Sequence, residues 1–219
     1  MWSGVATRSR LFWIALLVCV VSATRAVAQE PPPPGTVNVA HSRVFVFVGK
    51  KGAGHEHGVE GRLTAGELRF DGPQAGGKLL FDMKSFAADT DAARRFFQMP
   101  GKTDADTQSQ VTANMHGAAV LDVAKHPSAE FVVRAVRALP PRQGVAGNLF
   151  QLDGEFTLHG VKKPLGMTIV VDSVNGWVHA YGDFTMKQTD FSIKPFSKFL
   201  GAVGVTDELR VYGDLYLQP

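Results

Sequence analysis

Two histidines in a glycine-rich segment are the residues best suited to ligand chemistry in this chain. His55 and His57 lie in the segment Gly52–Gly58, GAGHEHG, with Glu56 between them. Residues two apart in extended backbone share a face, so both imidazoles can contact one ligand. Imidazole is a common ligand of zinc and copper, which makes a metal site one interpretation. Contact with the head group of a bound molecule and a solvated polar turn are the two alternatives.

A metal ion would need more than this pair. Zinc in proteins usually has three or four protein ligands. Five other histidines are available, but none lies at a diagnostic spacing: His41, His116, His126, His159 and His179.

Catalytic motifs are missing from the sequence. It contains no GxSxG, HExxH, P-loop or dinucleotide-binding pattern. His41-Ser42 and His126-Pro127-Ser128 bring histidine close to serine only along the chain, and neighbouring residues of a strand face opposite ways. We therefore expect a non-catalytic protein.

The N-terminal segment has the features of an export signal. Arg8 and Arg10 precede an apolar run from Leu11 to Val21, and Ala26-Val27-Ala28 matches the small-x-small cleavage pattern. A membrane-spanning helix needs about 20 apolar residues, more than this run supplies. We predict a signal peptide over 1–28, a periplasmic location, and no stable membrane span after cleavage.

Cleavage removes the excess of positive charge. The chain has 23 basic and 20 acidic side chains, and three of the bases, Arg8, Arg10 and Arg25, lie in the predicted signal. The remaining chain has no formal net charge, which argues against nucleic acid or an anionic membrane as a partner. The only cysteine, Cys19, is lost as well, so disulfides and thiol chemistry are excluded from the cleaved chain.

These side chains must be positioned by β-strands. After a proline-rich leader at 29–35, apolar and polar residues alternate along most of the predicted domain, 36–219. The clearest stretch is Leu149–Leu165, where one side carries Phe150, Leu152, Phe156 and Leu158. The other expected strands are 37–39, 59–63, 68–70, 79–83, 129–139, 167–171, 176–186 and 209–217, together with 44–48, which is apolar on both faces.

Short-range signals mark the turns and a helical insertion. His159-Gly160 breaks the alternating run before a second strand starts, and Asn175-Gly176 predicts a tight hairpin. Between 90 and 116 the pattern becomes helical, with Asp89 or Thr90 capping a first helix and Asp104 or Thr107 capping a second.

Two apolar clusters lie outside the alternating runs. Phe96, Phe97, Met99, Val111 and Met115 belong to the helical insertion and either anchor it to the sheet or cover the mouth of a cavity. The residues around Pro195 either close the opposite mouth or form a plug: Phe191, Ile193, Phe196, Phe199 and Leu200.

The pattern as a whole predicts an all-β, antiparallel fold of about eight strands with a short helical insertion. The apolar face of such strands must be covered. A closed barrel around a lipid-filled interior and a β-sandwich interaction domain with a packed core both satisfy this requirement.

Five segments narrow the choice of fold. In chain order they are His41–Val48 with Gly58–Leu63, His126–Phe131, Glu155–Leu165, Thr189–Ile193 and Asp207–Leu217. Together they resemble the YceI-like family of lipocalin-like, polyisoprenoid-binding periplasmic proteins. The chain departs from the family pattern in GAGHEHG, which replaces a short link, in 89–121, and at Gln188, where many members carry arginine.

The resemblance implies an antiparallel lipocalin-like barrel whose apolar tunnel holds a long-chain isoprenoid lipid of polyprenyl or quinone type. It implies no required cofactor and no nucleic acid partner, and a homodimer is compatible with it. A periplasmic metal-handling or redox-associated module that uses His55 and His57 is the alternative function. The predicted tunnel residues are Phe45, Phe47, Phe81, Phe131, Phe150, Leu152, Phe156, Leu158 and Ile169.

Overall fold

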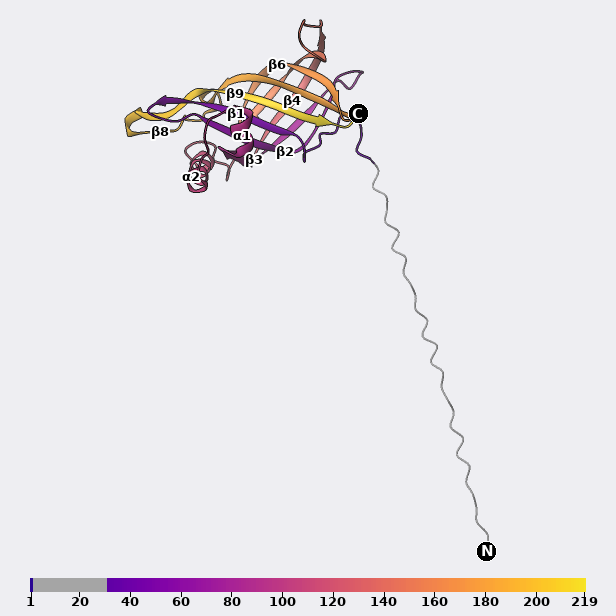
Figure 1. Cartoon of the computed structure of the whole chain (residues 1–219). Coiled ribbons are helices and arrows are strands. Elements are labelled where there is room, and N and C mark those ends of the chain that lie inside the picture. Colours follow the sequence, from indigo (N-terminus) through magenta and orange to yellow (C-terminus); the bar gives the residue numbers. More distant parts are fainter. Residues whose placement is uncertain (2–30) are drawn as a thin grey trace. The chain divides into compact units, whose positions relative to one another are not determined.

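One antiparallel sheet dominates the computed structural model, which describes Met1 and residues 31–219 (Figure 1). The predicted signal peptide lies almost entirely outside the described residues. The sheet contains one short strand, β8 (Ser197–Lys198), and eight long strands: β1 (Arg43–Gly52), β2 (His57–Arg69), β3 (Gly76–Ala88), β4 (Ser128–Leu139), β5 (Asn148–Leu158), β6 (Val161–Val174), β7 (Trp177–Lys187) and β9 (Val203–Leu217).

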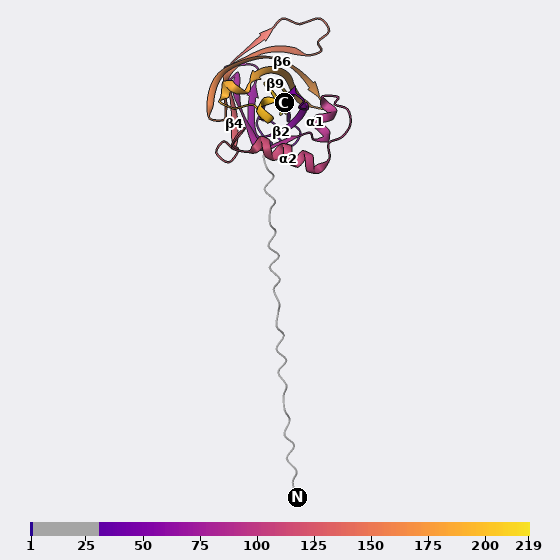
Figure 2. The same cartoon turned by 90° about the vertical axis from the view of Figure 1, so that its left-hand side faces the viewer.

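The sheet closes into a barrel. Each strand from β1 to β7 pairs with the next, β7 pairs with β9, and β9 pairs with β1. Figure 2 shows the strands curving round in a ring when the molecule is turned by 90°. Since a closed sheet has no second sheet to pack against, the closure confirms the predicted barrel and excludes the sandwich.

Two tight turns set the register of β5, β6 and β7. His159 and Gly160 have φ of 52° and 75°, and Asn175 and Gly176 have φ of 50° and 81°. Two successive residues with positive φ are what a type I′ hairpin turn requires. Leu158 therefore pairs with Val161. The break expected at His159-Gly160 and the hairpin predicted at Asn175-Gly176 are both confirmed.

β2 corrects one prediction from the sequence. The runs 59–63 and 68–70 predict two short strands, but the structure has one strand of 13 residues. The register between β2 and β3 shifts between Leu63 and Ala65. Such a bulge accommodates an extra residue without ending the strand, and the small residues around it break the alternation in the sequence.

The helical insertion between β3 and β4 is confirmed. In α1 (Asp91–Phe96) the Thr90 hydroxyl accepts the amide of Ala93 at 3.0 Å. In α2 (Ala105–His116) the Asp104 carboxylate accepts the amide of Thr107 at 2.9 Å. Each cap satisfies an amide that the first helical turn leaves unpaired. Among the described residues, no helix is long and apolar enough to cross a membrane.

A short hairpin follows β7. The 3-10 helix η1 (Gln188–Phe191) leads to β8 (Ser197–Lys198), and η2 (Phe199–Gly201) turns the chain into β9. β8 pairs with the start of β9, and Figure 1 shows this hairpin at the same end of the barrel as α2. The apolar cluster around Pro195 therefore lies at the same end of the barrel as α2 and not at the opposite mouth, because β7 ends and β9 begins there.

Packed side chains close the other end. Leu68 at the end of β2 and Leu217 at the end of β9 are 2% and 0% exposed. Of the predicted leader, residues 31–35 are described, and the Gly35 amide donates to the carbonyl of Gln218 at 2.9 Å. The barrel thus has a filled end near its termini and a helix-flanked end opposite.

Candidate functional site: an apolar cavity inside the barrel

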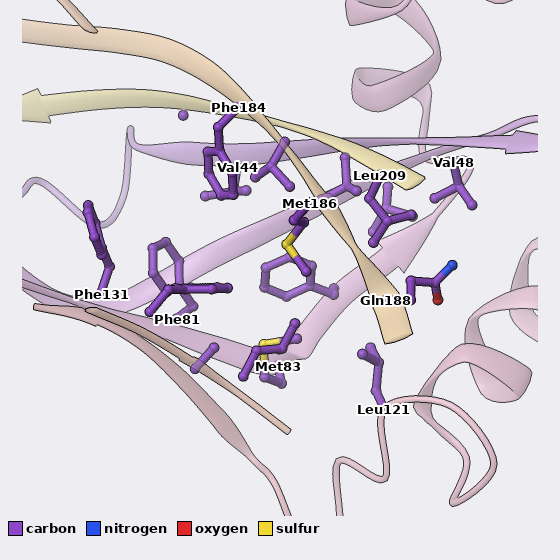
Figure 3. A pocket seen from close by; sticks show the side chains of 18 of the residues that line it. Val44, Val48, Phe81, Met83, Leu121, Phe131, Phe184, Met186, Gln188 and Leu209 are labelled. Carbon is purple, nitrogen blue, oxygen red and sulfur yellow. The ribbon is translucent and has the colours of Figure 1, made fainter. Parts of the chain in front are cut away.

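A cavity of about 250 Å³ lies inside the barrel. All eight long strands contribute to its wall, because alternate residues of each strand point inward. The lining is almost entirely aliphatic and aromatic, and Figure 3 shows these side chains gathered from several strands. Small-molecule pockets usually enclose about 300–1,000 Å³, so this cavity is slightly smaller than most.

Six of the nine predicted tunnel residues line this cavity. They are Phe81, Phe131, Leu152, Phe156, Leu158 and Ile169. Their contact with a lipid stays a prediction, but they occupy the positions that such contact requires.

Phe156 is the centre of the aromatic part of the wall. Its ring centroid lies 5.6 Å from that of Phe191, 6.2 Å from Phe81, 6.3 Å from Phe184 and 6.5 Å from Phe131, each in an edge-to-face arrangement. Edge-to-face pairs stabilise one another beyond the burial of their area. The cluster gives the cavity an aromatic middle section.

The other three predicted residues lie outside the cavity wall. Phe45 stacks on Phe96 of α1 at 4.3 Å, and Phe47 lies edge-to-face with Phe97 at 5.5 Å. Both are on the outer face of β1, since α1 covers that face. Phe150 packs on Phe70 at 5.2 Å.

The sequence did not single out the inward residues of β1. Val44, Val46 and Val48 line the cavity in place of the neighbouring phenylalanines. The run VFVFV is apolar on both faces, so alternation alone does not say which face points inward. The signal in the sequence that decides it is the adjacent pair Phe96-Phe97, which needs an apolar surface outside the barrel.

Methionines give the wall room to adapt. Met83, Met115, Met167 and Met186 all line the cavity. Met is unbranched and has three rotatable bonds, so it repacks around ligands of different shape more readily than Leu or Ile. The cavity can thus enlarge around a chain longer than the empty volume suggests.

Polar side chains reach the cavity mainly at its helix-flanked end. His57 starts β2 and lines the cavity beside its partner Val48, and Gln188 follows the end of β7. In Figure 3, Val48, Gln188 and Leu121 lie toward one end, away from Phe81 and Phe131. The side-chain amide of Gln188 donates to the Thr206 carbonyl at 2.7 Å.

A buried carboxylate fixes the orientation of His57. Asp89, at φ of 54°, is 6% exposed. One of its oxygens lies 2.8 Å from Nδ1 of His57, and the other accepts the amide of Gly58 at 3.2 Å. The Arg94 guanidinium lies 3.9 Å from the same carboxylate.

This arrangement determines what His57 can offer a ligand. A carboxylate only accepts, so the proton of a neutral His57 ring is on Nδ1 and the lone pair is on Nε2. Nε2 has no hydrogen-bond partner among the described residues. It can accept from a hydroxyl group at the cavity end.

A hydrogen-bonded aspartate holds η1 against β9 at this same end. Asp207 accepts the hydroxyl of Thr189 at 2.7 Å and its amide at 2.9 Å. These bonds lower the pKa of Asp207 from its ordinary value. The contact keeps Gln188, the first residue of η1, in the cavity wall.

The structure separates the two histidines of GAGHEHG. His55 is exposed in the loop before β2, whereas His57 is half-buried against Asp89. Within residues 31–219, no three His, Cys, Asp or Glu side chains are grouped so that they could hold a metal ion. The predicted metal site thus gains no third ligand there.

The two histidine–serine neighbours have structural partners. Ser42 is 0% exposed, and its hydroxyl accepts the amide of Tyr216 at 3.0 Å. His126 packs on the ring of His159 at 4.4 Å. Neither arrangement provides a nucleophile with a base.

A family model described as the YceI-like domain matches residues 36–216, nearly all of the barrel. The chain belongs to the YceI-like family. This is a family of binding barrels not known for catalysis, and membership is consistent with a hydrophobic ligand in the cavity.

Solved structures share the YceI-like fold. The crystal structure of Burkholderia cenocepacia BcnA is 18% identical, covers 82% of this chain and 98% of its own, and has a TM-score of 0.54. The crystal structure of the Campylobacter jejuni YCEI protein is 9% identical, covers 95% and 99%, and has a TM-score of 0.50. No curated protein matches the chain. At these identities the likeness concerns the fold alone.

Proposed function

We propose that this protein is an exported, non-catalytic carrier of a long-chain isoprenoid lipid of polyprenyl or quinone type. The observation that carries the proposal is the cavity, which is lined by apolar side chains from every long strand of the barrel. Such a wall suits a ligand that is itself a flexible hydrocarbon. The branched, unsaturated tail of an isoprenoid also packs well on aromatic rings such as Phe156.

Burial of the tail supplies enough free energy for tight binding. Removing about 400 Å² of tail from water contributes on the order of 10 kcal/mol at roughly 25 cal/mol per Å². The costs of ordering the chain reduce this value. Binding therefore needs no charged group in the wall, which agrees with the apolar lining.

The head group of the lipid belongs at the helix-flanked end. His57 offers a lone pair there, held in place by Asp89 at 2.8 Å. A hydroxyl, as in a polyprenol or a reduced quinone, can donate to it. The tail then extends past Met83 and Phe156 toward the closed end.

The location proposed for this carrier is the periplasm. It rests on the predicted signal peptide over 1–28, whose basic start, apolar run and cleavage pattern occur in the expected order. A carrier that shields an apolar chain is useful in an aqueous compartment next to membranes.

Gly213 offers a way to block the cavity without disturbing the wall. It lies on β9 between the inward residues Val211 and Leu215, and a Cβ added to it would meet no atom within 4 Å. A phenylalanine there fills empty space, whereas an alanine leaves most of that space open.

The test is a thermal titration of Gly213→Phe and Gly213→Ala with a long-chain polyprenol and a long-chain isoprenoid quinone in micelles. Saturating ligand should raise the Tm of the wild type and Gly213→Ala by about 5–10 °C. Gly213→Phe should fold and show no rise. An equal rise in all three proteins, or none in the wild type, would contradict the proposal.

A further inference from the structure

The tip of the β8–β9 hairpin exposes two large apolar side chains. The two side chains are adjacent in sequence, and Phe199 is 78% exposed and Leu200 is 110% exposed. Both have positive φ, 50° and 54°, a conformation that bulky side chains rarely adopt. The chain thus tolerates both unfavourable solvation and an unfavourable backbone at this tip, a combination that accumulates at functional sites.

The base of this hairpin forms part of the cavity wall, and the tip projects beyond it. Ile193 and Phe196, which precede the tip, and Val205, which follows it, line the cavity. The pairing of Ser197 with Gly204 ties the hairpin together, and Figure 1 shows it projecting at the end where α2 lies. A molecule that enters or leaves through this end passes the base of the hairpin that carries the tip.

Lysines surround the tip. Lys194 and Lys198 lie on the hairpin and are exposed. Lys50 and Lys51, also exposed, end β1 opposite Val205 and Gly204.

The hairpin segment 194–204 and the end of β1 at 49–52 contain no acidic residue. The acidic groups that flank these segments are Glu56, exposed in the loop before β2, Asp190, exposed in η1, Glu208, farther along β9, and Asp207, which is bonded to Thr189. The neutral net charge expected for the cleaved chain therefore conceals a local positive cluster.

We propose that the Phe199–Leu200 tip inserts into the interface of a lipid bilayer that contains anionic lipids, and so places the cavity mouth at the membrane. Apolar side chains surrounded by lysines are the pattern of proteins that lie on such interfaces. Lysines near an anionic surface add attraction, and the effect falls with salt. This inference rests on the proposed function, since a lipid carrier must collect its ligand from a bilayer.

Vesicle sedimentation tests the tip separately from the cavity. The vesicles contain phosphatidylethanolamine and phosphatidylglycerol and no isoprenoid, so binding does not depend on loading. The double variant Phe199→Asn/Leu200→Asn should lower vesicle binding about tenfold. Asparagine tolerates positive φ, and both side chains are exposed, so the fold should be kept.

A matched control and a charge variant sharpen the test. Val39→Asn changes an exposed apolar residue, 38% exposed, near the closed end and should bind vesicles like the wild type. Lys194→Gln/Lys198→Gln should bind about threefold more weakly and depend less on phosphatidylglycerol and salt.

Three results would overturn the inference. The first is a wild type that does not bind vesicles, and the second is a tip variant that binds vesicles as well as the wild type does. The third is a tip that joins two copies of the chain instead of binding a bilayer. Analytical ultracentrifugation detects the last case. Polyprenol in micelles should still raise the Tm of the tip variant. If polyprenol does not raise the Tm of the wild type but the wild type binds vesicles through its tip, the proposed ligand is contradicted and the membrane contact is supported.

Discussion

Asp89 shows how one residue connects stability with the site. Its carboxylate is buried, satisfies the Gly58 amide and orients His57 toward the cavity end. The residue also takes a positive φ that aspartate tolerates better than most residues do. The position of the His57 ring, the hydrogen bond of the Gly58 amide and the backbone conformation at residue 89 all depend on the Asp89 side chain.

Replacing Asp89 should therefore destabilise the barrel. We expect Asp89→Ala to lower the free energy of unfolding by about 1–3 kcal/mol, because the Gly58 amide loses its acceptor in a buried place. Urea denaturation measures the effect. Asp71→Ala, in the exposed turn after β2, is the control and should stay within about 0.5 kcal/mol of the wild type. Equal losses in the two variants would show that the Asp89 bonds add little.

For single residues, the sequence pattern predicts which strands are apolar better than it predicts which side chains point into the barrel. The alternation of β5 correctly placed Leu152, Phe156 and Leu158 together on the cavity side. The two-sided run of β1 contains no such information, and Phe45 and Phe47 lie outside the barrel because α1 packs there. The role of Asp89 depends on contacts across 31 or more residues, which no local pattern specifies.

Among the elements, the junction between η1 and β9 keeps the mouth in shape. Asp207 ties Thr189 to the start of β9, and the adjacent Gln188 then reaches the Thr206 carbonyl. Turn and cap residues elsewhere were predictable, since Thr90, Asp104 and the two glycine turns act locally. The β8–β9 hairpin was not, because only its pairing with β9 holds it.

The Asp207 junction should depend on pH. Its pKa is lowered by the bonds from Thr189, so the carboxylate stabilises the fold fully above the ordinary value of 3.8. That contribution is lost as the pH falls through the lowered pKa. Asp207→Asn should therefore have a lower urea midpoint than the wild type at pH 7, and the difference should shrink in strong acid.

Comparing wild type and variant at both pH values isolates this junction from other aspartates with a lowered pKa, such as Asp104 and Asp153. A difference that stays constant with pH would contradict the assignment.

For the whole molecule, closure of the sheet is what turns amphipathic strands into a container. The same alternation in an open sheet would predict only one buried face, and it is the pairing of β9 with β1 that encloses the cavity. The resemblance of five segments to the YceI-like family predicts this closure, which alternation alone does not. The proposed membrane contact belongs to the surface of the barrel, since the Phe199–Leu200 tip and its lysines lie at the helix-flanked end.

The most direct measurement is native mass spectrometry of the protein purified without detergent from the exported fraction, followed by identification of any extracted lipid. The wild type should carry one isoprenoid lipid per chain, and Gly213→Phe should be empty. A wild type that is empty after gentle purification would contradict the central claim. So would a wild type that carries another class of molecule, if Gly213→Phe carries the same amount of that molecule.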